Sequence, residues 1–221
     1  TLFALLATCA ASADAQTYRL KPVGAADGLA NSFVHAMDQD ASGRLWIGTG
    51  GGAGLFDGRH VTMFTTADSL AEDYVSSIHA EQDGSVWFGH NEGGISRYAK
   101  GVFTKVRTGV LTGSTINAIA DDGHGGVWAA AQNNGVVHIT RDGKCMPGIN
   151  IDGVLWYSLM DLDGGSLIAG ASDGLHLLRL TADGTLKTVG DLSGITRAPV
   201  RSLVRSPDGR IHAGTDGDGV V

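Results

Sequence analysis

The stretch Gly43-Arg44-Leu45-Trp46-Ile47-Gly48 decides the fold, because related stretches return four more times. These lie at residues 84–89, 125–130, 165–170 and 209–214. The fourth residue of each stretch is called here the anchor position, and the anchors are separated by 41, 41, 40 and 44 residues: Trp46, Trp87, Trp128, Ile168 and His212. Self-similarity at such a period indicates a repeat architecture.

Two further features keep the same period. Apolar pairs precede each anchor by twelve and nine residues: Val34/Met37, Val75/Ile78, Ile116/Ile119, Trp156/Leu159 and Val200/Leu203. A glycine followed by an apolar residue comes shortly after each anchor: Gly54-Leu55, Gly94-Ile95, Gly135-Val136, Gly174-Leu175 and Gly219-Val220. Agreement at three offsets over five copies establishes a genuine repeat.

Each copy has the pattern of strands. Short apolar runs are bounded by Asp-Gly, Gly-Gly or Asn-Gly pairs, and no helical periodicity persists. For the second copy the sequence predicts strands at 74–81, 85–89, 94–98 and 102–106, with a turn at residues 82–84. A small residue two places after each anchor fits a close approach between neighbouring sheets: Gly48, Gly89, Ala130, Gly170 and Gly214.

Four antiparallel strands in about 41 residues are typical of a propeller blade. The fold class is therefore all-β, a β-propeller with about five blades present of an expected seven, so that the ring is incomplete. Residues 18–29 align with 61–70, and we expect residues 18–22 to be the fourth strand of a blade whose other strands lie elsewhere. The anchor tryptophans Trp46, Trp87 and Trp128 are expected to pack between adjacent blades as core residues.

Composition and charge narrow the function. Of 221 residues, 43% are hydrophobic and 18% are charged, which is typical of a globular protein and not of a disordered one. The 34 glycines lack the period of collagen. A net charge of −7 without clustered lysine or arginine argues against binding of nucleic acid by this region.

The N-terminal residues are typical of an export signal. An apolar run at 2–11 precedes Ala13-Asp14-Ala15, so residues 1–15 are expected to be the C-terminal part of a signal peptide and 16–221 the partial propeller. A lipoprotein anchor at Cys9 and a buried core helix are the alternatives. Cleavage would leave Cys145 as a single cysteine, which cannot form an internal disulfide.

The repeat resembles the two-component regulator propeller family. The resemblance rests on residues 34–49, on the preceding Asp27-Gly28-Leu29, and on the recurrence from Tyr18 to Val221, with the last two copies lacking the tryptophan. It implies paired seven-bladed propellers in the periplasmic, ligand-binding half of an inner-membrane receptor. A membrane segment and an output module, such as a histidine kinase, a diguanylate cyclase or a transcription factor, usually follow in that family.

Candidate ligand-binding residues lie in loops expected around the central funnel, before the first strand and between the second and third strands of each copy. The predicted site residues are Asn31, Glu72, Asp73, His90, Asn91, Glu92, Gln132, Asn133 and Arg197. Polar residues without a dominant charge suit an oligosaccharide or another small polar ligand. The alternative is that such residues merely shape turns.

No residue pattern predicts a catalytic centre, a cofactor or a metal. The Asp38-x-Asp40-x-Ser42-Gly43 stretch resembles the start of a calcium loop, but Thr49 stands where a bidentate glutamate is needed, so turn formation is the better explanation. The eight histidines show no zinc-binding spacing. If the propeller were instead a lyase or hydrolase, Glu72, Asp73 and His90 would be its first candidates.

The sequence therefore favours a periplasmic sensor propeller that is not itself an enzyme and that signals to a missing output domain. The alternatives are a secreted scaffold for protein interaction and a secreted propeller enzyme. A homodimer is compatible with this reading, and the ligand, the output domain and the final number of blades are left open.

Overall fold

β-Strands dominate the computed structural model, which describes residues 21–162 and 164–221. Within these residues the strands form four four-stranded antiparallel sheets and one two-stranded sheet. We name the sheets blades A to E in chain order. Three short 3-10 helices lie before the first strands of blades A, B and C: η1 (Ala25–Asp27), η2 (Thr66–Asp68) and η3 (Gly109–Leu111).

The strands follow one another in the same order in every blade. Blade A contains β1 (Val34–Gln39), β2 (Leu45–Thr49), β3 (Gly52–Phe56) and β4 (Val61–Phe64). Blade B contains β5 (Val75–Ala80), β6 (Val86–His90), β7 (Ile95–Ala99) and β8 (Val102–Val106). Blade C contains β9 (Ile116–Asp121), β10 (Val127–Ala131), β11 (Gly135–Ile139) and β12 (Cys145–Ile149). Blade D contains β13 (Trp156–Asp161), β14 (Ser166–Ala171), β15 (Gly174–Leu180) and β16 (Leu186–Asp191). Blade E contains β17 (Val200–Arg205) and β18 (Ile211–Thr215).

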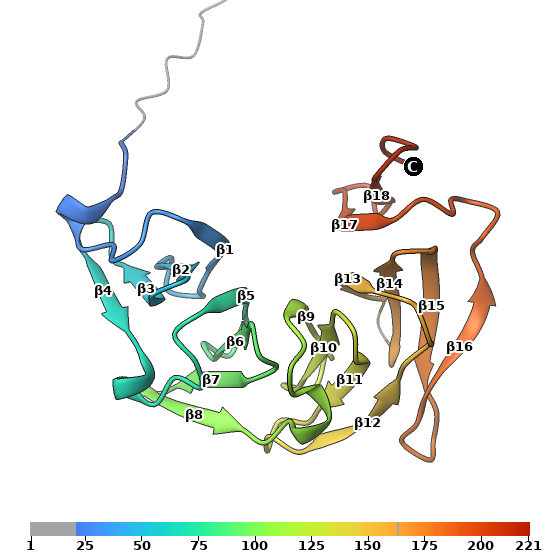
Figure 1. The fold of residues 1–221 in the computed structure, drawn as a ribbon, viewed down its shortest axis with the longest axis horizontal. Helices are drawn as coiled ribbons and strands as arrows, with labels where there is room; N and C mark the ends of the chain where they lie inside the picture. Colours follow the sequence, from blue (N-terminus) through green and yellow to red (C-terminus); the bar gives the residue numbers. More distant parts are fainter. Residues whose placement is uncertain (1–20, 163) are drawn as a thin grey trace, which may run out of the picture.

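The blades are arranged around a common axis as an open arc (Figure 1). The first strands β1, β5, β9, β13 and β17 lie side by side along its inner side, and the fourth strands form its outer rim. The arc is open between β1 and β17, so the predicted all-β propeller with an incomplete ring is confirmed.

The strand predictions for the second copy were close. The fourth strand has the predicted bounds, and the first strand begins one residue later and ends one residue earlier than predicted. One placement was wrong: His90, predicted to lie in a loop, is the last residue of β6 and pairs with Val75. The 3-10 helices were not predicted, because single turns leave no periodic pattern.

The anchor tryptophans pack toward the following blade. Trp46, Trp87 and Trp128 each occupy the second position of the second strand and are fully buried. Trp46 packs with residues of blade B, Trp87 with residues of blade C, and Trp128 with Trp156 of blade D. The core is therefore a series of apolar layers between blades, and three of these layers bury an anchor tryptophan.

Buried carboxylates accept hydrogen bonds from two of the indoles. Asp40 Oδ2 accepts from Trp46 Nε1 at 3.2 Å, and Glu81 Oε1 accepts from Trp87 Nε1 at 2.7 Å. In each case the carboxylate stands six residues before the tryptophan, at the turn between the first and second strands. The turn is thereby tied to the apolar layer.

The glycine two places after an anchor allows the next blade to approach, as predicted, at Gly48, Gly89 and Gly170. A Cβ atom on Gly48 would lie 2.8 Å from Val75 Cγ1, and one on Gly170 would lie 2.7 Å from Val200 Cγ1. The contacted valines are the first members of the apolar pairs. Two features of the repeat therefore meet at one contact between blades.

The open end of blade A exposes apolar side chains. Val34 is 42% exposed, whereas its equivalents Val75, Ile116, Trp156 and Val200 are 0% exposed. Phe33 and Met37 are also exposed beside it. No neighbouring sheet covers this face of β1 within the described residues.

Several predictions concern the N-terminal segment. The predicted signal segment at residues 1–15 lies outside the described residues, as does most of the strand expected at 18–22. Among the residues that the structure describes, no helix has the length and apolar character needed to cross a membrane.

Candidate functional site

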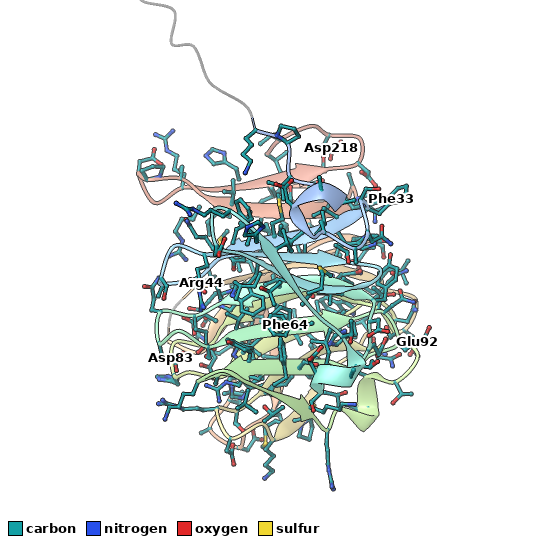
Figure 2. All side chains as sticks on the ribbon, turned by 90° about the vertical axis from the view of Figure 1, so that its left-hand side faces the viewer. Phe33, Arg44, Phe64, Asp83, Glu92 and Asp218 are labelled. Atoms are coloured by element: carbon teal, nitrogen blue, oxygen red, sulfur yellow. The ribbon has the colours of Figure 1, made fainter. Side chains whose placement is uncertain are left out.

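The two predicted sets of loops meet at one face of the arc. Figure 2 shows Phe33, Glu92 and Asp218 along one edge of the molecule, with Arg44 and Asp83 along the opposite edge. We call the first of these the loop face. Its loops precede the first strand of each blade or connect the second strand to the third. The structure therefore brings most of the predicted site residues to the same side.

Glu72 connects the two loops of blade B. Its Oε2 accepts a hydrogen bond from the backbone N–H of Glu92 at 2.9 Å, and its Oε1 accepts from that of Gly94 at 2.9 Å. Asp73 is exposed, and its Oδ1 accepts from the backbone N–H of Thr66 at 2.7 Å. Glu72 thus has a structural role that the sequence did not reveal.

The loops of blade C are held together in a similar way. Ser114 Oγ accepts from the backbone N–H of Asn133 at 2.8 Å. The backbone N–H of Gln132 donates to the carbonyl of Thr115 at 2.8 Å. The side chain of Thr115 also donates to Asn91 Oδ1 of blade B at 3.0 Å, which connects the loops of two blades.

His90 lies beneath this surface. It is fully buried, its Nε2 lies 2.9 Å from Ser96 Oγ, and its Nδ1 lies 3.1 Å from the carbonyl oxygen of Tyr74. Burial lowers the pKa of His90 below its ordinary value, although the contact with Tyr74 acts in the opposite direction. The imidazole therefore contacts the framework of the loop face and not its surface.

The remaining predicted residues differ in accessibility. Glu92, Asn133 and Arg197 are exposed on the loop face, whereas Asn91 and Gln132 are partly buried. Asn31 is partly buried, and its Oδ1 accepts from the backbone N–H of Phe33 at 2.9 Å. The exposed residues belong to different blades, so a ligand that contacts all of them must extend along the arc.

A row of polar residues on the innermost strands was not predicted. In every blade, one residue near the start of the first strand has no partner in the second strand, which is the pattern of a β-bulge. We call these five residues the inner row: His35, Ser76, Asn117, Tyr157 and Arg201. Because the first strands line the inner side of the arc, the row lies beside the central axis.

Members of the inner row contact the first strand of the next blade, or the residue just before it. The His35 ring stacks on Tyr74 with a centroid distance of 4.5 Å. Ser76 Oγ donates to the carbonyl of Ile116 at 2.8 Å, and Asn117 Nδ2 donates to the carbonyl of Trp156 at 2.7 Å.

The last contact of the row is between a cation and an aromatic ring. The Arg201 guanidinium carbon lies 3.9 Å from the centroid of the Tyr157 ring. Arg201 Nε also donates to Asp216 Oδ2 at 2.7 Å, and this hydrogen bond raises the pKa of Arg201 above its ordinary value. The guanidinium is therefore charged at this end of the row.

The sequence contains one feature that could have identified the inner row. Each member directly follows the first residue of an apolar pair, and all five are polar or amphipathic. The bulge itself has no local sequence signature here. It becomes visible only in the pairing register.

The aspartates that resemble a calcium loop form other contacts. Asp38 Oδ2 accepts from the backbone N–H of Ala80, and Asp40 Oδ1 accepts from those of Ser42 and Arg44. Arg44 also forms a 2.8 Å ion pair with Asp40. Within residues 21–162 and 164–221, no group of three or more His, Cys, Asp or Glu side chains is placed to hold a metal ion.

Comparison with solved structures gives the same fold. The chain is similar to the extracellular domain of a hybrid two component system, BT3049, from B. thetaiotaomicron, with 20% identity and a TM-score of 0.70 over 90% of this chain and 30% of that one. A second such domain, BT4673 from the same organism, matches with 22% identity and a TM-score of 0.66 over 85% of this chain and 26% of that one. The chain thus spans less than a third of the length of either domain.

The same fold also occurs in an enzyme. A catalytically inactive virginiamycin B lyase from Staphylococcus aureus matches with 16% identity and a TM-score of 0.64, over 85% of this chain and 68% of that one. No curated protein sequence matches the chain significantly. The structural matches therefore establish the fold, and the geometry of the site is the basis for assigning a function.

Sheet topology, blade packing and these matches define the molecule as a β-propeller. Residues 28–51, which include β1 and β2, match the model of the family described as two component regulator propeller. The chain carries the repeat of that family, in agreement with the resemblance seen in the sequence.

Proposed function

We propose that this chain is part of the extracytoplasmic sensor propeller of a bacterial signal-transduction receptor and that it binds a polar ligand such as an oligosaccharide. The family repeat at residues 28–51 supports this assignment, as does the similarity to extracellular domains of hybrid two component systems. Signalling would pass to a kinase, diguanylate cyclase or transcription-factor module elsewhere in the full-length protein.

The inner row is the observation that carries the ligand-binding part of this proposal. Bulges commonly redirect side chains next to binding sites, and here one occurs at the same position in every blade. The row combines the rings of His35 and Tyr157, each with a neighbouring side chain on one face, with the polar groups of Asn117 and Arg201. Flat rings and directional polar groups together suit a ligand with both apolar faces and hydroxyl groups.

Predicted residues of the loop face complete the proposed site in two roles. The exposed Asp73, Glu92, Asn133 and Arg197 are available to a ligand above the inner row. Glu72 and His90 position the loops, since their polar atoms already contact the protein. Asn31, Asn91 and Gln132 are partly buried, as Glu72 is.

The same contacts favour binding over catalysis at this face. A general base needs a lone pair directed at the substrate. Both carboxylate oxygens of Glu72 accept backbone hydrogen bonds, and both ring nitrogens of His90 lie within hydrogen-bonding distance of protein oxygens. We therefore assign these two residues to the framework of a binding site.

Placement in the periplasm is also a proposal, and it rests on the export signal predicted from the sequence at residues 1–15. In this arrangement the loop face is accessible to ligands from outside the cell. A homodimer of receptors would provide one route from ligand binding to signalling.

Titration calorimetry with a panel of neutral oligosaccharides tests the proposed function. We expect at least one oligosaccharide to bind the purified protein, and we expect His35→Ala and Tyr157→Ala to weaken that binding by about tenfold or more. Arg59→Ala is the matched control, because Arg59 is exposed in the β3–β4 turn away from the inner row. Equal binding by all four proteins, or no binding to any member of the panel, would contradict the proposal.

A further inference from the structure

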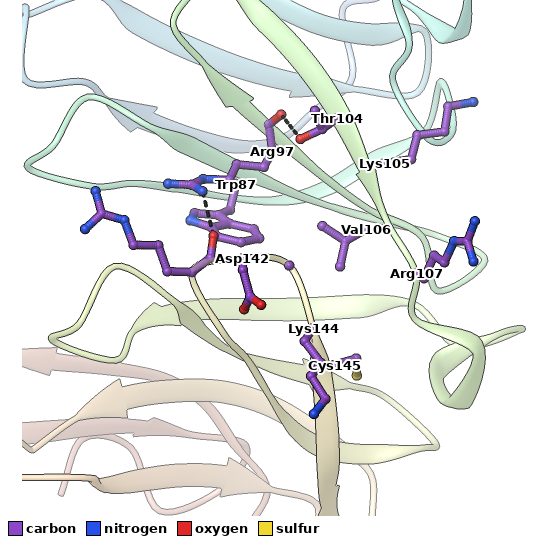
Figure 3. Close-up of a pocket in the computed structure, with 11 residues that line it drawn as sticks. Trp87, Arg97, Thr104, Lys105, Val106, Arg107, Asp142, Lys144 and Cys145 are labelled. Atoms are coloured by element: carbon purple, nitrogen blue, oxygen red, sulfur yellow. Dashed lines mark hydrogen bonds between the residues drawn. The ribbon is translucent and has the colours of Figure 1, made fainter.

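A cleft at the outer rim of the arc has a composition unlike that of the rest of the chain. It lies between blades B and C and has a volume of about 500 Å³. It is lined by residues of β6, β7, β8 and β12, by Arg107 directly after β8, and by the loop between β11 and β12. This size suits a ligand as large as one or two sugar units. The cleft lies on outer strands, whereas the inner row lies on the innermost strands (Figures 1 and 3).

Positive charge is concentrated there. A smaller hollow next to the cleft shares Arg97 and Arg141 with it. Together the two gather six of the 16 lysine and arginine residues: Arg97, Lys100, Lys105, Arg107, Arg141 and Lys144. Only two acidic residues, Asp83 and Asp142, line the same surfaces. The chain as a whole has a net charge of −7, so this local excess of positive charge is opposite in sign to the charge of the whole chain. It attracts anions.

Arg97 is held in a fixed orientation at one end of the cleft. Its guanidinium carbon lies 5.0 Å from the centroid of the Trp87 ring, and its Nη1 donates to the carbonyl of Arg141 at 2.8 Å (Figure 3). Its Nη2 lies 3.7 Å from Asp83. An arginine whose planar group is already ordered loses little further freedom when it binds an oxyanion.

Arg97 also carries an unsatisfied donor. Its Nε is buried and has no hydrogen-bond partner among the residues that the structure describes. Buried donors are nearly always paired with a protein group, a water or a ligand. Arg97 thus brings to this end of the cleft a guanidinium whose Nε donor is not used by the described residues of the protein.

Three other cations line the cleft. Lys105, Arg107 and Lys144 form no ion pair with a carboxylate within the described parts of the chain, and all three are exposed. Arg107 and Lys144 are brought together by a parallel β-bridge between the two blades. If these three cations only stabilised the contact between the blades, we would expect them to pair with carboxylates, as Arg97 and Arg141 do with Asp83.

We propose that the cleft between blades B and C binds a small polyanion that carries sulfate, phosphate or carboxylate groups. The ordered guanidinium of Arg97 contacts one anionic group, and Arg107 and Lys144 contact another. Bidentate arginine contacts to such oxyanions are among the stronger hydrogen bonds in proteins. The site is independent of the inner row, so either site can bind its ligand when the other does not.

Calorimetric titration of the purified protein tests this proposal with four probes: inorganic phosphate, inorganic sulfate, a sulfated disaccharide and the unsulfated form of that disaccharide. We expect at least one anionic probe to bind, the unsulfated disaccharide not to bind at this cleft, and the affinity to fall as salt rises from about 50 to about 300 mM. Binding of sulfated disaccharide without phosphate identifies a sulfated ligand, and the reverse result identifies a phosphorylated one.

Charge-neutralising variants locate the binding. The double variant Arg107→Gln/Lys144→Gln is expected to bind the anionic probe at least about tenfold more weakly, whereas the matched control Arg59→Gln/Lys187→Gln binds as the wild type does. Circular dichroism during heating verifies that both remain folded, and Lys105→Gln replaces the double variant if that protein fails to fold. Unchanged affinity in the cleft variants, or no anion binding by the wild type, would overturn the proposal.

Discussion

Gly89 and Ile116 define how closely two blades approach. A Cβ atom on Gly89 would lie 2.5 Å from Cγ2 of Ile116, the first apolar residue of the next blade, and 2.3 Å from Ser77 Oγ. Real Cβ atoms do not approach other atoms so closely. A residue with a side chain at position 89 of β6 would therefore require its neighbours to move. The same relationship recurs between Gly48 and Val75.

Gly89→Ala is therefore expected to lower the free energy of unfolding by about 1–3 kcal/mol, because an added methyl group overpacks the contact between blades. Gly109→Ala is the matched control, since a Cβ atom there would have no neighbour within 4 Å. Urea unfolding monitored by tryptophan fluorescence measures both values. A destabilisation no larger for Gly89→Ala than for Gly109→Ala would refute the close contact.

The hydrogen bond between Glu81 and Trp87 predicts different outcomes for two substitutions. Glu81→Ala leaves the buried indole N–H of Trp87 without its acceptor and is expected to cost about 1–3 kcal/mol. Glu81→Gln retains an acceptor oxygen and is expected to cost less. Comparable losses in the two variants would show that the carboxylate charge, and not the acceptor, stabilises the blade.

Burial raises the pKa of Glu81 above its ordinary value. The folded protein therefore binds a proton at Glu81 more tightly than the unfolded chain, and this contribution to stability is lost as pH rises through the folded-state pKa. We expect the free energy of unfolding of the wild type to increase relative to that of Glu81→Gln as the pH falls from neutral toward the pKa of glutamate. A difference that does not vary with pH would contradict the raised pKa.

Asp122 is expected to show the opposite dependence on pH. Burial acts to raise its pKa, but hydrogen bonds from His138 at 2.7 Å and from the backbone amides of His124 and Gly126 outweigh burial and hold the pKa below its ordinary value. The ionised carboxylate therefore stabilises the fold above the unfolded-state pKa of about 4, and this stabilisation is lost as pH falls through the folded-state pKa.

Asp122→Asn is accordingly expected to cost about 1–3 kcal/mol at neutral pH and progressively less in acid. Urea unfolding of both proteins at neutral pH and at a pH near the aspartate pKa provides the comparison. A cost that grows on acidification would mean that the carboxylate is not held in its ionised form.

The exposed edge of β1 predicts that a further blade of the same protein covers it. Val34 is 42% exposed, whereas the equivalent Val75 is fully buried against its neighbouring blade. In the full-length protein, Val34→Asp is then expected to destabilise the fold by several kcal/mol, and the same is expected of Val75→Asp, because both place a charge in an apolar layer. A change within about 0.5 kcal/mol for Val34→Asp would show that the edge stays exposed to solvent.

Much of this fold could be predicted because the repeat is local. Turn glycines, apolar pairs and anchors fall at fixed offsets, so the sequence alone places Trp46, Trp87 and Trp128 in equivalent strands. The end of β6 was misjudged, because His90 reads as a polar loop residue although its ring contacts both Ser96 and Tyr74 inside the fold.

The candidate site was predicted less completely, because its key geometry is not local. The predicted loop residues lie on one face of the arc, but the role of Glu72 depends on backbone amides twenty residues away or more. The inner row depends on strand register across five blades, and the outer cleft depends on Arg107 and Lys144 meeting from different blades. Such pairings follow from tertiary structure and have no signature in a single segment.

The central claim is that the inner row binds the polar ligand of a sensor. Backbone amide chemical shifts of the isotopically labelled protein, recorded while a bound oligosaccharide is titrated, test it most directly. The claim predicts that the largest shift changes occur at His35, Ser76, Asn117, Tyr157 and Arg201 and at their neighbours on the loop face. Saturable changes confined to other surfaces, with these five amides unmoved, would contradict it.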